Sequence, residues 1–158
     1  MATPAPTEFI AALDKPHTSA EGARLLETLG LAEADLQPDP LDEVGGRVYE
    51  DKSRALQLEY QDEGRRREIA YHDIGEGPWV LVQVFLRSAV AGAEAYPGPL
   101  PYGLHFDMSK QQLAQLLGAP DSSDPYVETW QKDGHRVLVN YEPKSGAIKS
   151  VGLQAPVM

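Results

Sequence analysis

The sequence predicts an α+β protein made of two tandem units, each with helix followed by antiparallel sheet. Two observations predict this class: apolar residues recur at helical spacing near the start of each half, and they alternate with polar residues in the segments that follow. The predicted division is a first unit at residues 1–90, a Pro/Gly-rich connector at 91–103 and a second unit at 104–158. The two sheets either remain separate or join into one curved sheet with the helices on one face.

Two helices are predicted at the start of the first unit. Residues 7–14 carry apolar side chains at helical spacing, and so do residues 19–29. Thr18 and Glu21 form a candidate capping box for the second helix, and Gly30 is its predicted stop.

An acidic segment follows at residues 31–46, which contain two prolines and no Lys or Arg. This composition predicts a loop. A solvated linker is one interpretation; the other is a partner-binding surface whose carboxylates meet basic side chains, where charge complementarity speeds association. The candidate residues are Glu33, Asp35, Asp39, Asp42 and Glu43.

Strand patterns follow each helical region. In the first unit, the predicted strands are residues 47–50, 55–61, 68–72 and 79–86. In the second unit, they are residues 126–131, 135–141 and 148–154. The second unit begins with a predicted helix, for which Ser109 and Gln112 form a capping box and Gly118 a left-handed end.

Register comparison favours a duplication. Ser109 stands 91 residues after Thr18, and an offset of 81 aligns residues 48–50 with 129–131 and residues 56–60 with 137–141. The longer first helix and the acidic segment account for the different offsets. Two copies with different insertions would present different loops on a shared scaffold.

Composition limits the partners. The formal net charge of -10 argues against nucleic-acid or anionic-membrane binding, which requires clustered basic residues, whereas a basic protein partner fits. The chain has no cysteine, no basic-then-apolar leader at its start and no apolar run of the ~20 residues that a membrane span needs. We therefore expect a cytoplasmic protein, monomeric or homodimeric.

Catalytic and metal-binding patterns are not found in the sequence. The four histidines, His17, His72, His105 and His135, are dispersed without metal-ligand spacing. The sequence has no nucleophile elbow, phosphate loop or dinucleotide fingerprint. We expect neither enzymatic activity nor a cofactor or metal.

An arginine cluster at residues 65–67 falls on a predicted hairpin turn. One interpretation is a solvated cluster balanced by the neighbouring acids Asp62, Glu63 and Glu68. The other is an anion clamp.

Aromatic residues on the predicted strands are candidate interface anchors. Tyr and Trp offer large contact area at low entropic cost, but half of each strand faces the helices, so each is also a candidate core residue. The residues assigned to partner binding on this basis are Tyr49, Tyr60, Trp130 and Tyr141.

The second unit resembles two related groups of proteins. The resemblance rests on residues 99–104, on Met108-Ser109 with Leu113, on residues 117–121, and on the Trp130 strand with its Gly134 turn. One group is the helix-then-meander module of the BamE/SmpA lipoproteins and of the beta-lactamase inhibitor protein, which duplicates it. The other is the bacterial toxin-immunity proteins, pyocin-type among them.

The chain departs from the lipoproteins in lacking a signal and a lipobox cysteine, and from the secreted inhibitor in lacking disulfides and a signal. The resemblance then implies a non-catalytic immunity protein that occludes a cognate toxin, with a nuclease effector among the candidates. The alternative function is a small-molecule-binding or regulatory accessory domain that uses the concave sheet face.

Overall fold

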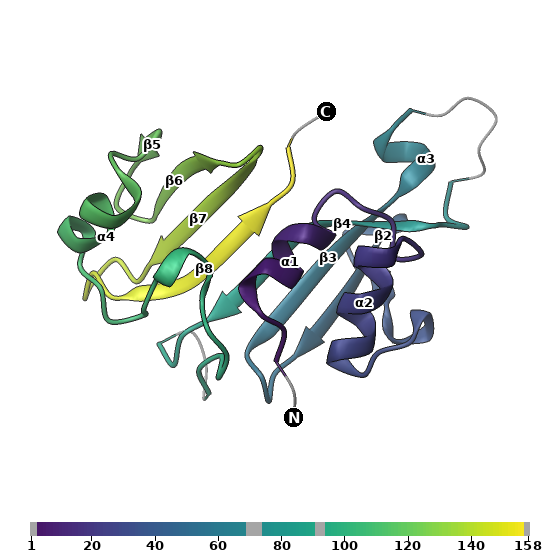
Figure 1. Cartoon of the computed structure of the whole chain (residues 1–158), viewed down its shortest axis with the longest axis horizontal. Coiled ribbons are helices and arrows are strands. Elements are labelled where there is room, and N and C mark those ends of the chain that lie inside the picture. The colour runs from purple at the N-terminus through teal and green to yellow at the C-terminus, as the bar shows by residue number, and fades with distance from the viewer. Residues whose placement is uncertain (1–2, 69–73, 91–93, 157–158) are drawn as a thin grey trace.

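The computed structural model describes residues 3–68, 74–90 and 94–156, and one antiparallel sheet runs through them (Figure 1). The helical elements in these residues are α1 (Pro6–Ala12), α2 (Ala20–Leu29), α3 (Glu63–Arg66), α4 (Lys110–Leu117) and the 3-10 turns η1 (Glu33–Asp35) and η2 (Pro101–Gly103). The strands are β1 (Gln37–Asp39), β2 (Asp42–Asp51), β3 (Leu56–Asp62), β4 (Trp79–Arg87), β5 (Ser122–Ser123), β6 (Val127–Lys132), β7 (His135–Tyr141) and β8 (Ile148–Gln154). The α+β prediction is confirmed.

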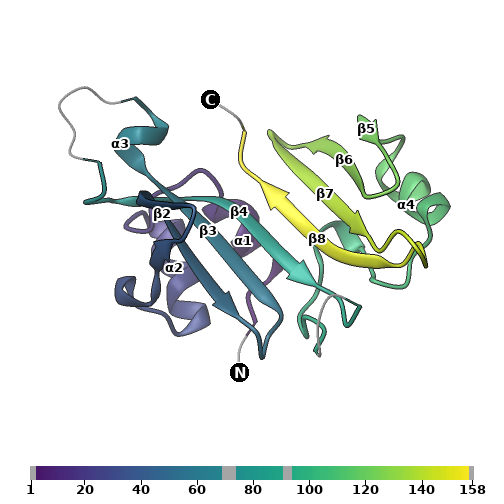
Figure 2. The same ribbon diagram turned by 180° about the vertical axis from the view of Figure 1, so that it is seen from behind.

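The strand order is β1-β2-β3-β4-β8-β7-β6-β5, and every neighbouring pair is antiparallel. Each half therefore begins at a sheet edge and ends at the centre, where β4 pairs with β8 from Gln83↔Gln154 to Arg87↔Ser150. The helices α1, α2 and α4 lie on one face of this sheet, and no helix of the described residues lies on the opposite face (Figures 1 and 2). We call the uncovered side the open face.

Strand alternation sends one set of side chains beneath the helices. On β3, Leu56, Leu58 and Tyr60 are buried; β7 buries Val137, Val139 and Tyr141 in the same manner. These side chains join the apolar residues of α1, α2 and α4 in one hydrophobic core. Burial of this apolar surface is the dominant favourable contribution to folding.

Helix-end chemistry explains where α2 and α4 begin. Ser19 caps α2 by accepting a hydrogen bond from the backbone N–H of Gly22, so the predicted cap at Thr18 is wrong by one residue. Gly30 ends α2 in the left-handed region, as predicted. The capping box of Ser109 and Gln112 is confirmed in both directions.

At the end of α4, Gly118 has a positive φ of 87° but an extended ψ of -175°, so it ends the helix without the predicted left-handed turn. This conformation still requires a glycine.

The acidic segment is not a loop, contrary to prediction. The carboxylate of Asp35 accepts a hydrogen bond from the backbone N–H of Ala32 at 2.8 Å and forms η1. Gln37 and Pro38 then pair with β2, which makes residues 37–51 a β-hairpin. Backbone pairing with β2 supplies hydrogen bonds that composition does not reveal.

The arginine cluster is also placed differently from its prediction. Asp62 accepts a hydrogen bond from the backbone N–H of Arg65 and starts the one-turn helix α3 in place of a hairpin turn. The strand predicted at residues 68–72 falls almost entirely on residues 69–73, which lie outside the described residues.

The predicted connector packs against the core. Tyr96 is buried, and its ring meets that of Phe9 edge-on with centroids 6.3 Å apart. The backbone N–H of Tyr96 donates to the carbonyl of Arg87 at 2.8 Å, which holds this segment at the end of β4.

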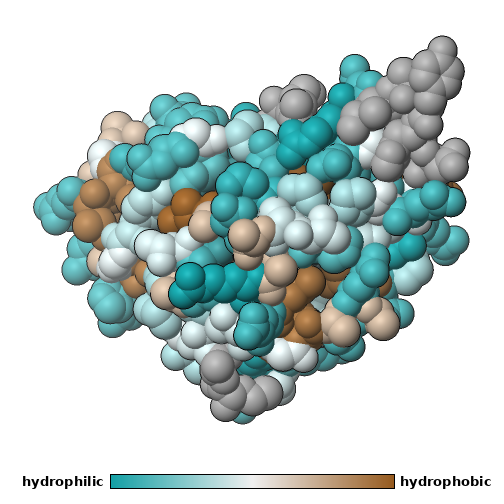
Figure 3. Space-filling view, turned by 45° about the vertical axis from the view of Figure 1, so that its right-hand side comes forward, coloured by the Kyte–Doolittle hydropathy of each residue, from teal (hydrophilic) through white to brown (hydrophobic). Residues whose placement is uncertain are grey.

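The surface seen from the side that carries α2 and α3 is mostly hydrophilic, and its hydrophobic patches are separate (Figure 3). No helix within the described ranges is long and apolar enough to cross a membrane.

Candidate functional site

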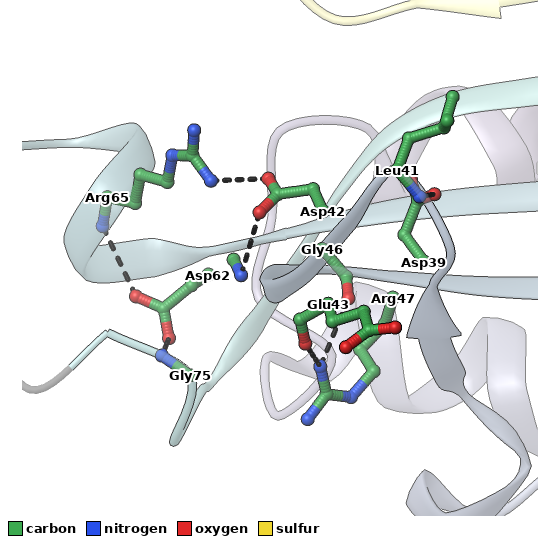
Figure 4. A network of polar contacts seen from close by, with 10 residues as sticks. Asp39, Leu41, Asp42, Glu43, Gly46, Arg47, Asp62, Arg65 and Gly75 are labelled. Atoms are coloured by element: carbon green, nitrogen blue, oxygen red, sulfur yellow. Dashed lines mark hydrogen bonds and ion pairs between the residues drawn. The ribbon is translucent and has the colours of Figure 1, made fainter.

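The β1–β2 turn exposes apolar side chains among acids. We call residues 39–44 the hairpin tip. Leu41 is 95% exposed and Val44 is 63% exposed, the two highest values among the large hydrophobic residues described. The Asp39 carboxylate accepts a hydrogen bond from the backbone N–H of Leu41 at 2.9 Å, which shapes the turn and leaves the leucine side chain pointing away from the sheet (Figure 4).

An ion pair ties the hairpin tip to α3. Asp42 pairs with the Arg65 guanidinium and also accepts a hydrogen bond from the backbone N–H of Gly45 at 3.1 Å (Figure 4). The hydrogen bond from Arg65 lowers the pKa of Asp42. Asp42 therefore remains negatively charged through the neutral range.

The other side of the tip rests on Arg47. Its guanidinium donates to the carbonyl oxygens of Glu43, at 3.2 Å, and Gly46, at 3.0 Å, and lies 4.1 Å from the centroid of the Trp79 ring. These contacts hold the backbone of Glu43, and its side chain is exposed. The tip is thus supported from two sides, while Leu41, Glu43 and Val44 are exposed.

The five predicted acids do not form one surface. Asp39, Asp42 and Glu43 gather at the hairpin tip, while Glu33 and Asp35 lie on η1. Glu33 lies 3.4 Å from Nε2 of His17, and Asp35 caps its own turn. Local structure engages acids in both places, and what distinguishes the hairpin tip as the candidate site is the exposure of Leu41 and Val44 beside its acids.

The predicted aromatic anchors require correction. Tyr60, Trp130 and Tyr141 are buried on the helix-covered side, at 1–4% exposure, so they do not offer the outward anchors that were expected. Trp130 donates from Nε1 to the carbonyl of Gly118 at 2.9 Å. Tyr49 is half-buried on the same side. The physical reason is that each of these aromatic side chains lies on the same side of its strand as the apolar residues that the helices cover.

Two residues were missed at the tip. Leu41 and Val44 interrupt the acidic segment, and this interruption is the only signal that the sequence offers for them. The loop prediction gave no reason to single out Leu41 and Val44, because it is the hairpin turn that projects both side chains outward.

The arginines of α3 are balanced by acids within the fold. Arg66 donates from Nε to Asp14 at 2.8 Å, and Arg67 lies within ion-pair distance of Asp14 and Glu63. With Arg65 paired to Asp42, the interpretation as a charge-balanced cluster is favoured over an anion clamp. Of the predicted acids, Glu63 is an ion-pair partner, and Asp14 and Asp42 are partners that were not predicted.

Two of the four histidines, His17 and His135, make contacts within the fold. His17 accepts at Nδ1 from the backbone N–H of Trp79 at 2.9 Å, and His135 lies 2.9 Å from the hydroxyl of Tyr102 through Nε2. His72 is outside the described residues. In the part of the chain that the structure describes, no three His, Asp or Glu side chains are grouped so as to hold a metal ion.

Comparison with known proteins reveals a likeness of fold. No family model matches the chain, and no match is found among curated proteins. An extracellular protein containing a SCP domain from Bacillus anthracis superposes with a TM-score of 0.56 at 9% identity, over 98% of this chain and 48% of that one. This chain thus spans about half of that protein's length, and at such low identity the likeness concerns the fold alone.

A DUF4309 family protein (YjgB) from Bacillus subtilis matches with a TM-score of 0.45 at 9% identity, over 95% of this chain and 91% of that one. This likeness is too distant to bear on either fold or function.

Proposed function

We propose that the protein is a non-catalytic immunity protein that binds a basic bacterial toxin domain and neutralises it by occlusion. The observation that carries the proposal is the hairpin tip, where Leu41 and Val44 are exposed among the carboxylates of Asp39, Asp42 and Glu43. Protein interfaces commonly have an apolar centre surrounded by a polar rim. The resemblance of the second unit to toxin-immunity proteins supplies the class of partner.

Electrostatics favour a basic partner. The formal net charge of -10 would speed association with a cationic surface, and the acids of the tip would face its Lys and Arg side chains. A partner that covers the tip together with its surroundings would bury about 1,600 Å² in total, as stable complexes commonly do.

The proposal includes a tandem origin for the two halves and a curved sheet. Its support is that β1 to β4 and β5 to β8 each form a meander from edge to centre, with helix earlier in the same half. Duplication of one helix-and-meander module, followed by pairing of the final strands, would generate this order. The proposed boundaries remain residues 1–90, 91–103 and 104–158.

Co-expression with the product of the neighbouring gene tests the function. We expect a stoichiometric complex that loses affinity as the salt concentration rises, and loss of the toxin's activity in proportion to the complex formed. The interface variant is Leu41→Asp combined with Glu43→Lys, since neither side chain makes a hydrogen bond within the described structure. We expect this variant to weaken binding at least about tenfold.

The matched control combines Glu27→Lys with Leu116→Asp, which makes the same two kinds of substitution and the same change of net charge at exposed positions away from the tip. Equal weakening by both variants would indicate a general charge effect and contradict a site at the tip. A complex that forms without inhibiting the toxin would contradict occlusion.

A further inference from the structure

A second candidate site lies on the open face, remote in sequence from the hairpin tip. It is a hollow of about 550 Å³ where β4, β8 and β7 lie side by side. Clefts for small molecules commonly have volumes of about 300–1,000 Å³. The side chains that matter most here are Phe85, Arg87, Tyr126, Asn140, Lys149 and Ser150.

The charge of the hollow is opposite to that of the protein. Arg87 and Lys149 line it, and no carboxylate of a described residue does, although the chain carries a formal net charge of -10. The acids that interact with these two cations stand outside the lining. Glu50 lies 3.6 Å from Arg87, Glu59 also interacts electrostatically with Arg87, and Glu142 interacts in the same way with Lys149.

Arg87 is held in place yet remains able to change partners. It donates to the side-chain oxygen of Gln57, its neighbour across β3 and β4, which orients the guanidinium. Its ion pair with Glu50 is partly exposed and 3.6 Å long, so solvent weakens it. A ligand anion that enters the hollow can therefore replace Glu50 as the partner of Arg87.

Aromatic groups supply an apolar contact. The ring of Phe85 lies against the backbone of Gly152 on β8, where a β-carbon would stand 3.4 Å from two ring atoms. The Tyr126 side chain is 62% exposed and also lines the hollow. Two polar groups also line the hollow: the side-chain amide of Asn140 donates to the hydroxyl of Ser150 at 2.9 Å, which holds both in place.

We propose that this hollow binds a small aromatic acid. Arg87 and Lys149 pair with its anionic group, and Phe85 and Tyr126 contact its ring. The combination requires both features, since a bare inorganic anion would leave the aromatic contacts unused and a neutral ring would offer the two cations no negative charge. The site is independent of the hairpin tip and of any protein bound there.

The test uses 8-anilinonaphthalene-1-sulfonate, a fluorescent aromatic anion, with the full chain. We expect saturable binding that Arg87→Gln and Lys149→Gln each weaken about tenfold. Arg136→Gln is the matched control, because Arg136 lies on the same face, bonded to Gln154, but outside the hollow. Thermal unfolding of each variant establishes that it is folded, and Arg87→Lys is expected to restore most of the affinity.

Equal affinity in all three Gln variants, or no saturable binding, would overturn the proposal. So would weakening by Leu41→Ser instead, because the probe would then occupy the hairpin tip. The neutral analogue N-phenyl-1-naphthylamine is expected to bind at least about tenfold more weakly, and equal binding would refute recognition of the anion.

Discussion

Gly22 packs so closely against Pro16 that a β-carbon placed on it would stand 2.2 Å from the Pro16 carbonyl oxygen. This contact joins the first turn of α2 to the segment that leads from α1 into it. The backbone N–H of Gly22 donates to the hydroxyl of Ser19, so Gly22 also takes part in the N-terminal cap of α2. Steric demand at this point therefore fixes how the chain enters α2.

Replacement of Gly22 by Ala is expected to destabilise the protein by about 2 kcal/mol or more, although helix propensity alone favours Ala by about 1 kcal/mol. The clash is with backbone, which cannot move aside as a flexible side chain can. Urea denaturation measures the free energy of unfolding. Ala23→Gly on the exposed side of the same turn is the comparison and should cost about 1 kcal/mol; a stabilising Gly22→Ala variant would contradict the close contact.

Acid sensitivity is predicted at Asp51. Burial by itself would raise the pKa of Asp51, but hydrogen bonds from Ser53, at 2.6 Å, and from Arg54, at 2.5 Å, outweigh burial and lower the pKa well below its ordinary value. The folded state therefore binds fewer protons than the unfolded state. The stabilising contribution of the Asp51 carboxylate is complete above about pH 4 and is lost as the pH falls further.

Asp51→Asn should lower the free energy of unfolding by about 3 kcal/mol at neutral pH, because Arg54 is buried and loses its charged partner. Denaturation at a series of pH values measures this difference, which should shrink below about pH 4. A difference that is constant with pH would indicate that the carboxylate charge is not what stabilises this cluster.

A second pH effect is predicted at His135, which is buried beside Tyr102. Burial lowers the pKa of His135, so the unfolded state takes up its proton first as the pH falls below about 6.5. Stability is therefore complete above that pH and declines through the mildly acidic range.

His135→Gln should remove this part of the decline, and the exposed His105→Gln should leave it intact. Thermal unfolding between about pH 7.5 and 5 compares the three proteins. An unchanged pH profile in the His135 variant would exclude this residue as the origin of the decline.

Leu41 is predicted to matter for binding and not for folding. Its side chain is almost fully exposed, so Leu41→Ser should change the free energy of unfolding by less than about 0.5 kcal/mol. Leu58→Ala, at a fully buried position on β3, should cost about 3 kcal/mol. Comparable losses in the two variants would mean that the hairpin tip packs against the protein in solution.

Prediction of the elements succeeded where neighbours in sequence decide the structure. The cap of Ser109 and Gln112 and the stop at Gly30 are contacts within a few residues, so sequence spacing specifies them. The hairpin at residues 37–51 was missed because β1 owes its strand conformation to pairing with β2. Composition predicted a loop because it carries no information about pairing with β2.

The candidate site was predicted in part. The acids of the tip were identified from charge alone, but their separation from Glu33 and Asp35 depends on η1 and on the start of the hairpin. Alternation grouped Tyr141 with Val137 and Val139 on one side of a strand. Alternation does not show whether helices cover that side of the strand, since this depends on where the helices pack in the folded chain.

The sequence by itself determined the class of the fold, the N-terminal cap of α4 and the acidic character of residues 31–46, because each depends on local spacing or on composition. Only the tertiary structure decided that Leu41 projects from a turn, that Tyr60, Trp130 and Tyr141 are buried, and that Arg87 and Lys149 line one hollow. The physical reason is that burial and charge clustering arise between residues far apart in the chain. Strand pairing sets their distances, and no local pattern encodes it.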